Sequence, residues 1–156
     1  MSKKTKEDLD FEALDWQYVI VSHFLIPLPH DWTVEIDKDA GKVRGYKGKE
    51  AKLTVSLYSL NGEKKENLSE SLQKFGKAYE ENNFDLCSGI NNAGAFLFQY
   101  HSFEGEPLML IALTEKEYQG KLYHIFFVFR TENRAALKKY MMHLYHIVKR
   151  TSIALN

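Results

Sequence analysis

Two histidines near the end of the chain have a spacing that could hold a metal ion. His143 and His146 are three positions apart in a segment with helical periodicity, so both side chains would project from one side of a helix. Lys139 and Arg150 fall on the same side, which offers no carboxylate ligand. We therefore predict no metal site and interpret these four residues as a basic, solvent-exposed helix face. The alternative is contact with an acidic partner that strengthens as the histidines become protonated.

Two further histidines, His101 and His124, lie in segments with strand character. If the turns between these strands are centred near residues 105 and 119, His101 lies opposite Met109, and Met109 lies opposite Phe129. His124 is then five residues out of line, about 17 Å along the strand, and on the other face of the sheet. We do not expect the two histidines to form one site.

No nucleophile has a context that would activate it. Cys87 is the only cysteine, which excludes an intramolecular disulfide, a multi-cysteine zinc site and a CxxC motif. Ser88-Gly89 lacks the preceding glycine of a nucleophile elbow. We predict that the protein is not an enzyme and needs no cofactor.

Residues 41–52, GKVRGYKGKEAK, place five basic residues around Tyr46 without forming a P-loop. The segment is interpreted as a solvated hairpin, with an anion contact as the alternative. The whole chain has 21 basic and 21 acidic residues, so nucleic acid is not an expected partner. The longest apolar run has about seven residues, whereas a membrane span needs about 20, and we expect none.

The elements that must position these residues follow from hydrophobic periodicity. A charged arm at residues 1–15 precedes a single domain at 16–156, whose 44% hydrophobic and 27% charged residues are typical of globular proteins. The strands are predicted at 16–26 (ending at Pro27), 32–37, 51–60, 84–90, 95–103, 107–115 and 121–130. Helices are predicted at about 67–82 and 132–150. Both faces of 108–113 and 125–129 are apolar, so the expected fold is α/β (α+β), a single α/β/α layered domain in which helices cover a mostly antiparallel sheet.

The segment FLIPLPHDWTV (residues 24–34) carries a resemblance to a known superfamily. Its F-x-I-P-L-P-H-D-W pattern resembles the F-x-(L/I)-P-x-x-W opening of PsbP-like domains, matching through Leu28, Pro29 and Trp32. That superfamily includes PsbP, the Ran-binding Mog factor, DcrB-like proteins and Eag-type adaptor chaperones, and no branch is assigned. The resemblance implies an antiparallel sheet between helices and functions that are mostly non-catalytic.

These features predict a non-catalytic protein-binding module, such as an adaptor, chaperone or immunity-like protein of the bacterial cytoplasm. The N-terminal segment has no apolar core of a signal peptide, which favours that compartment. A homodimer is also considered, because small domains often cover an exposed sheet edge with a second copy. The alternative is a small-ligand-binding domain with Tyr58, Tyr100 and Tyr123 lining a pocket between sheet and helix. The candidate partner-binding residues are Trp32, Tyr46, Lys139, His143, His146 and Arg150.

Overall fold

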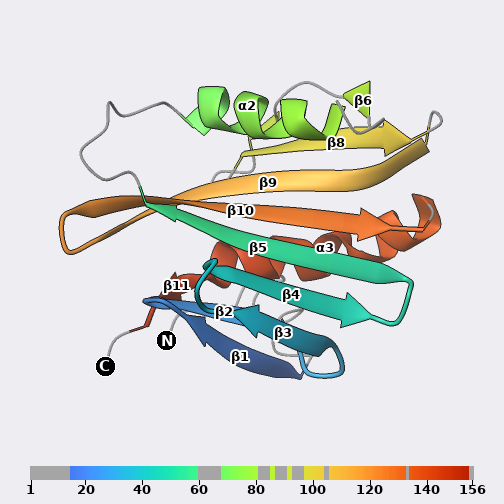
Figure 1. Cartoon of the computed structure of the whole chain (residues 1–156). Helices are drawn as coiled ribbons and strands as arrows, with labels where there is room; N and C mark the ends of the chain where they lie inside the picture. The colour runs from blue at the N-terminus through green and yellow to red at the C-terminus, as the bar shows by residue number, and fades with distance from the viewer. Residues whose placement is uncertain are drawn as a thin grey trace, which may run out of the picture.

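The computed structural model describes residues 15–59, 68–80, 85–86, 91–92, 97–103, 106–132 and 134–154. Their strands form two antiparallel sheets (Figure 1). The larger sheet has the order β3 (Thr33–Asp37), β4 (Lys42–Lys47), β5 (Ala51–Ser59), β10 (Lys121–Thr131), β9 (Glu106–Tyr118), β8 (Leu97–Phe103) and β6 (Asp85–Leu86), and β7 (Asn91–Asn92) also pairs with β8. The smaller sheet has the order β1 (Trp16–Val21), β2 (Phe24–Pro29) and β11 (Ser152–Ile153).

Among the described residues, two helices accompany the sheets, α2 (Leu68–Glu80) and α3 (Arg134–Arg150). They correspond to the helices predicted at about 67–82 and 132–150. Neither of them is long and apolar enough to cross a membrane. The predominance of antiparallel strands, with two helices, confirms the α+β class.

The first predicted strand, 16–26, is in fact a hairpin. The chain turns at Ser22, whose φ is 55°, and β2 then pairs antiparallel with β1 along its whole length. Pro27 lies inside β2 and does not end the strand as predicted, and Pro29 is the last residue of β2. A proline fits a strand where its missing N–H would face no neighbour, and β11 pairs only with Phe24 and Leu25 on that edge of β2.

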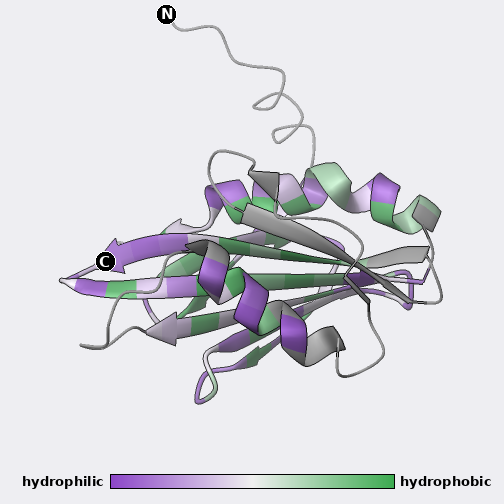
Figure 2. Ribbon diagram, turned by 90° about the horizontal axis from the view of Figure 1, so that it is seen from above, coloured by the Kyte–Doolittle hydropathy of each residue, from purple (hydrophilic) through white to green (hydrophobic). Residues whose placement is uncertain are grey.

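The large sheet has a hydrophobic core on each face. Ile125, Phe127 and Phe129 of β10 belong to the core that includes α3 and the small sheet. The alternating residues Phe126 and Val128 belong to the core that includes Leu72 of α2. Figure 2 shows the two helices on opposite sides of the sheet. Both faces of β10 are therefore apolar for the predicted reason, because the strand is covered on both sides.

The described helices do not cover the whole large sheet. On the α2 side, α2 packs against β6, β8 and β9, and its Phe75 also contacts Phe126 of β10 and Tyr58 of β5. The same face of β3, β4 and β5 bears exposed polar side chains, including Glu35, Arg44 and Lys52. On the α3 side, the small sheet shares the cover with α3. The described residues thus do not establish the complete helix–sheet–helix layering that the sequence predicted.

The register of the β9–β10 hairpin differs by one residue from the prediction. Its two-residue turn, Gln119-Gly120, has φ values of 50° and 78°, the combination of a type I′ turn. His101 lies opposite Met109 as predicted, but Met109 pairs with Arg130 rather than with Phe129. A shift of one residue exchanges the faces of a strand, so His124 is on the same face as Met109 and not on the other.

Candidate protein-interaction surface

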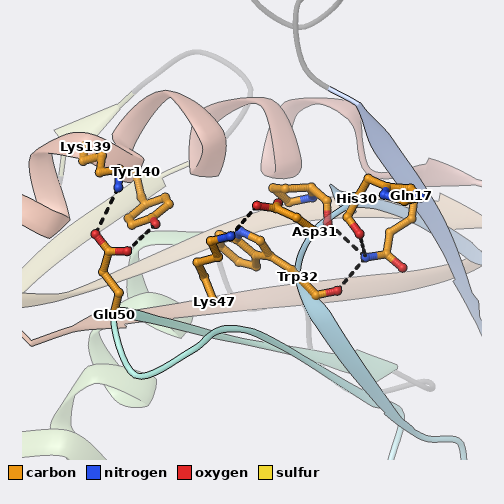
Figure 3. A network of polar contacts seen from close by, with 9 residues as sticks. Gln17, His30, Asp31, Trp32, Lys47, Glu50, Lys139 and Tyr140 are labelled. Carbon is orange, nitrogen blue, oxygen red and sulfur yellow. Dashed lines mark hydrogen bonds and ion pairs between the residues drawn. The ribbon is translucent and has the colours of Figure 1, made fainter.

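The corner between β2 and β3, which carries Trp32, is held from the neighbouring strand β1. The side-chain amide of Gln17 donates hydrogen bonds to the carbonyl oxygens of Pro29 (3.0 Å) and Trp32 (2.8 Å). Figure 3 shows the bond to Trp32. Trp32 is only 4% exposed, and its indole lies edge-on to the ring of Tyr140 on α3 with 5.8 Å between centroids. The structure places this predicted contact residue in the core, where its role is to fix the corner.

Polar side chains near the β2–β3 corner bind each other and α3 (Figure 3). We call Asp31, Lys47, Glu50, Lys139 and Tyr140 the corner network. Glu50, in the β4–β5 turn, accepts hydrogen bonds from Lys139 (3.1 Å) and Tyr140 (2.9 Å). These bonds hold the pKa of Glu50 below its usual value. Asp31 and Lys47 form a second ion pair, in which the lysine hydrogen bond lowers the pKa of Asp31. Lys139 is exposed, as predicted, but its ammonium group is already bound to the carboxylate of Glu50.

His143 lies beside this network and is half-buried. Its ring is edge-on to Tyr140 at 5.2 Å, and its Nδ1 is buried with no hydrogen-bond partner among the described residues. Burial lowers the pKa of His143. The charge of Asp31 acts in the opposite direction, and the charge of Lys139 lowers this pKa further. Protonation of His143 consequently requires a lower pH than for a free histidine.

His146 does not share the exposed helix face that the sequence predicted. It is only 1% exposed, and its ring lies edge-on to Trp16 at 6.4 Å and to Tyr145 at 5.7 Å. Arg150, one turn further on, is half-buried. The prediction that His146 is exposed to solvent is wrong, because the small sheet packs beside α3 and buries more of the helix surface.

Tyr46 lies on the part of the large sheet that α2 leaves open. Its hydroxyl donates a hydrogen bond to Glu35 (3.2 Å), and the ammonium of Lys52 lies 5.8 Å from the centre of its ring. Arg44 and Lys52 lie on the same face of the sheet as Tyr46, with Arg44 opposite Glu35. Lys47, by contrast, is bound to Asp31. The hairpin forms as predicted, whereas its cations are divided between different neighbours.

The tyrosines proposed to line a ligand pocket lie on different faces. Tyr58 is opposite His124 on the α2 side and lies edge-on to Phe126 at 5.4 Å. Tyr123 belongs to the core on the other side, edge-on to Phe24. The side chain of Tyr100 is outside the described residues. Tyr58 and Tyr123 therefore cannot line one pocket.

A polar pair on β9 and β10, formed by a buried histidine and a half-buried glutamate, was missed in the sequence. His124 is 2% exposed, and its Nε2 lies 3.0 Å from Oε2 of Glu115, directly opposite it. The correct hairpin register would have placed the two residues together. Across the described segments, no group of three or more His, Cys, Asp or Glu side chains could hold a metal ion.

Among the residues whose burial the structure describes, the most exposed large apolar side chains belong to β1. Tyr18 is 57% exposed and Ile20 is 55% exposed, and they alternate with the buried Val19 and Val21. β1 is an edge strand at the lower margin of Figure 1, and no strand of the described chain pairs with its second edge. We call Tyr18 and Ile20, which share one face of this strand by alternation, the β1 surface.

The other open edge at this side of the molecule, β3, has a different character. Its sequence TVEID includes Glu35 and Asp37, both exposed, whereas WQYVIV in β1 has no charged residue. Charges on an edge strand discourage pairing with another chain. Of these two edges, β1 is the one that lacks this protection. This difference between the two edge strands was not predicted, because residues 16–26 were interpreted as one continuous strand.

Comparisons with known proteins agree on the fold. No family model and no curated protein matches the chain. Its structure is similar to that of cyanobacterial PsbP (CyanoP) from Synechocystis sp. PCC 6803, with a TM-score of 0.60, 12% identity, and coverage of 88% of this chain and 92% of that chain. It is also similar to LpqN, described as involved in cell envelope biogenesis of Mycobacterium tuberculosis, with a TM-score of 0.53, 14% identity, and coverage of 97% and 98%.

These similarities define the class: the chain has a PsbP-like fold, in agreement with the resemblance at residues 24–32. At such low identities the likeness concerns the fold and assigns no particular branch. Function has to be inferred from the surface of this chain.

Proposed function

We propose that the protein is a non-catalytic protein-binding module whose partner docks on β1. The observation that carries this proposal is the exposure of Tyr18 and Ile20 on an edge strand without charges. Apolar side chains clustered on a surface, with more than half of each exposed to water, are typical of interaction sites. The edge of β1 that pairs with no described strand adds backbone N–H and C=O groups at Tyr18 and Ile20 that an extended segment can complete.

The two parts of the surface would have different roles in binding. Backbone pairing along β1 would provide affinity for any extended segment. Tyr18 and Ile20 would act as anchors, because burial of a large aromatic or aliphatic side chain is worth about 1.5–3 kcal/mol. Lys139, His143, Arg150 and Tyr46 remain candidates for peripheral contacts, whereas Trp32 and His146 would support the surface from the core.

An adaptor or chaperone-like role, or that of an immunity-like protein, in the cytoplasm fits such a module. A single cysteine is compatible with a reducing compartment. The description of LpqN as involved in cell envelope biogenesis makes the envelope the competing location. Fractionation of cells that express the tagged protein at its natural level separates the two.

The test of the proposed function is affinity capture with a matched pair of variants. Ile20→Lys places a charge on the β1 surface, and Ile36→Lys places the same charge on the exposed edge strand β3, where Ile36 is 45% exposed. We expect the wild type and Ile36→Lys to capture the same protein from cells of the source organism, and Ile20→Lys to lose it. Equal capture by both variants, or none by the wild type, would overturn the proposal.

A further inference from the structure

We propose that the occupant of the β1 surface is a second copy of this chain, joined by antiparallel pairing of the two β1 strands about a two-fold axis. This inference rests on the proposed function, because it names the partner of the same surface. The pairing would join the two three-stranded sheets into one continuous sheet of six strands.

The chemistry of β1 favours itself as a partner. A two-fold axis near Val19 would place Tyr18 of each copy opposite Ile20 of the other, on the same face of the joined sheet. Aromatic and β-branched residues in directly opposed positions are favourable cross-strand pairs. Both side chains are more than half exposed in the single chain, so both have area left to bury.

Charge distinguishes β1 from the alternative edge. A second copy meets no like charge along WQYVIV, because the strand has no charge at all. The corresponding pairing of two β3 strands would bring Glu35 and Asp37 of one copy close to the same carboxylates of the other. Like charges in opposed positions destabilise a sheet, so β3 is unsuited to self-association.

The same absence of charge argues for a second copy over a different protein. Discrimination between partners commonly depends on complementary charges or on repulsion of the wrong partner, and β1 provides neither. A self-complementary strand needs no such code, since the two-fold axis presents the same side chains to each other. One strand of six residues is short for an interface, so the dimer should be weak, with a Kd roughly in the micromolar range or above.

The inference is tested by sedimentation velocity of the full chain from about 1 μM to about 1 mM. We expect a monomer–dimer equilibrium whose Kd rises at least about tenfold in Ile20→Lys and stays unchanged in Ile36→Lys. Circular dichroism and thermal unfolding check that both variants remain folded. A wild type that stays monomeric overturns the inference, and so does a dimer that Ile20→Lys leaves intact.

A charge-swap experiment asks whether β1 meets β1. One variant carries Tyr18→Lys with Ile20→Lys, and the other carries Tyr18→Glu with Ile20→Glu. Each should be monomeric alone, because like charges oppose each other, and an equimolar mixture should associate. A mixture that stays monomeric, while the wild type dimerises, would show that β1 contacts a different surface of the second copy.

The affinity capture separates this inference from the proposed function. A monomeric wild type that still captures another protein through β1 overturns the second copy as the occupant and leaves the binding module in place. Loss of both results overturns both.

Discussion

Trp32 and Tyr140 meet edge-on, with 5.8 Å between their ring centroids, at the point where the β2–β3 corner reaches α3. Both side chains are buried, and each residue has a separate polar partner, which binds the backbone of Trp32 and the side chain of Tyr140. Gln17 holds the carbonyl of Trp32, and Glu50 accepts the hydroxyl hydrogen of Tyr140. The contact therefore connects the small sheet, the large sheet and the helix.

Gly45 makes room for this contact, and its replacement should destabilise the protein. A Cβ at Gly45 would lie 3.1 Å from Cε3 of Trp32, closer than ordinary van der Waals contact. Because Trp32 is confined by Tyr140, we expect Gly45→Ala to lower the free energy of unfolding by about 1–3 kcal/mol. Denaturant unfolding measures the change. In a Trp32→Phe background the same substitution should cost less, and an equal cost in both backgrounds would contradict the explanation.

Glu50 should make part of the stability depend on pH in the acidic range. Hydrogen bonds from Tyr140 and Lys139 keep its pKa in the folded protein below the usual 4.5. Its stabilising contribution is then complete above about pH 4.5 and is lost as the pH falls through the lower, folded pKa. Glu50→Gln should be less stable than the wild type near neutral pH, and this difference should shrink on acidification.

The control for this prediction is Glu132→Gln, which changes an exposed carboxylate outside the corner network. Urea unfolding at several pH values between about 3 and 7 compares the three proteins. A difference between the wild type and Glu50→Gln that stays constant with pH would show that the carboxylate does not act through its charge.

The pair of the buried His124 and the half-buried Glu115 should contribute to stability through the hydrogen bond at Nε2. Glu115→Leu removes that partner from a nearly inaccessible ring, and we expect a loss of about 1–3 kcal/mol in the free energy of unfolding. Glu117→Leu, two residues along the same strand and exposed, should change it by no more than about 0.5 kcal/mol. Equal effects of the two substitutions would mean that the pair makes no specific contribution.

The sequence predicted the elements better than their pairing. Alternation and helical periodicity are local, so α3 and the doubly buried β10 could be read directly. The hairpin at Ser22 was missed because no glycine or asparagine marks the turn, and β1 and β2 appeared as one strand. That error concealed the small sheet. As a result, the burial of His146 and the exposure of Tyr18 were both unforeseen.

The site was predictable only as far as single segments allow. Lys139 is exposed, as its helical position indicated. Its ion pair with Glu50 joins residues 89 positions apart, and neither segment contains a pattern that predicts this contact. Tyr46 is in the predicted hairpin. The neighbouring Lys47 is bound to Asp31, and this contact depends on the position of the β2–β3 corner. Contacts between distant segments require the three-dimensional arrangement.

Residue-resolved amide hydrogen exchange along β1 tests the central claim most directly. The free protein should exchange rapidly at alternate β1 positions, those whose N–H points away from β2. In the presence of the captured partner, or at high protein concentration if the chain pairs with itself, these amides should slow while those of β3 stay unchanged. Unaltered exchange in β1, with new protection on β3 or α3, would contradict the assignment of β1 as the interaction surface.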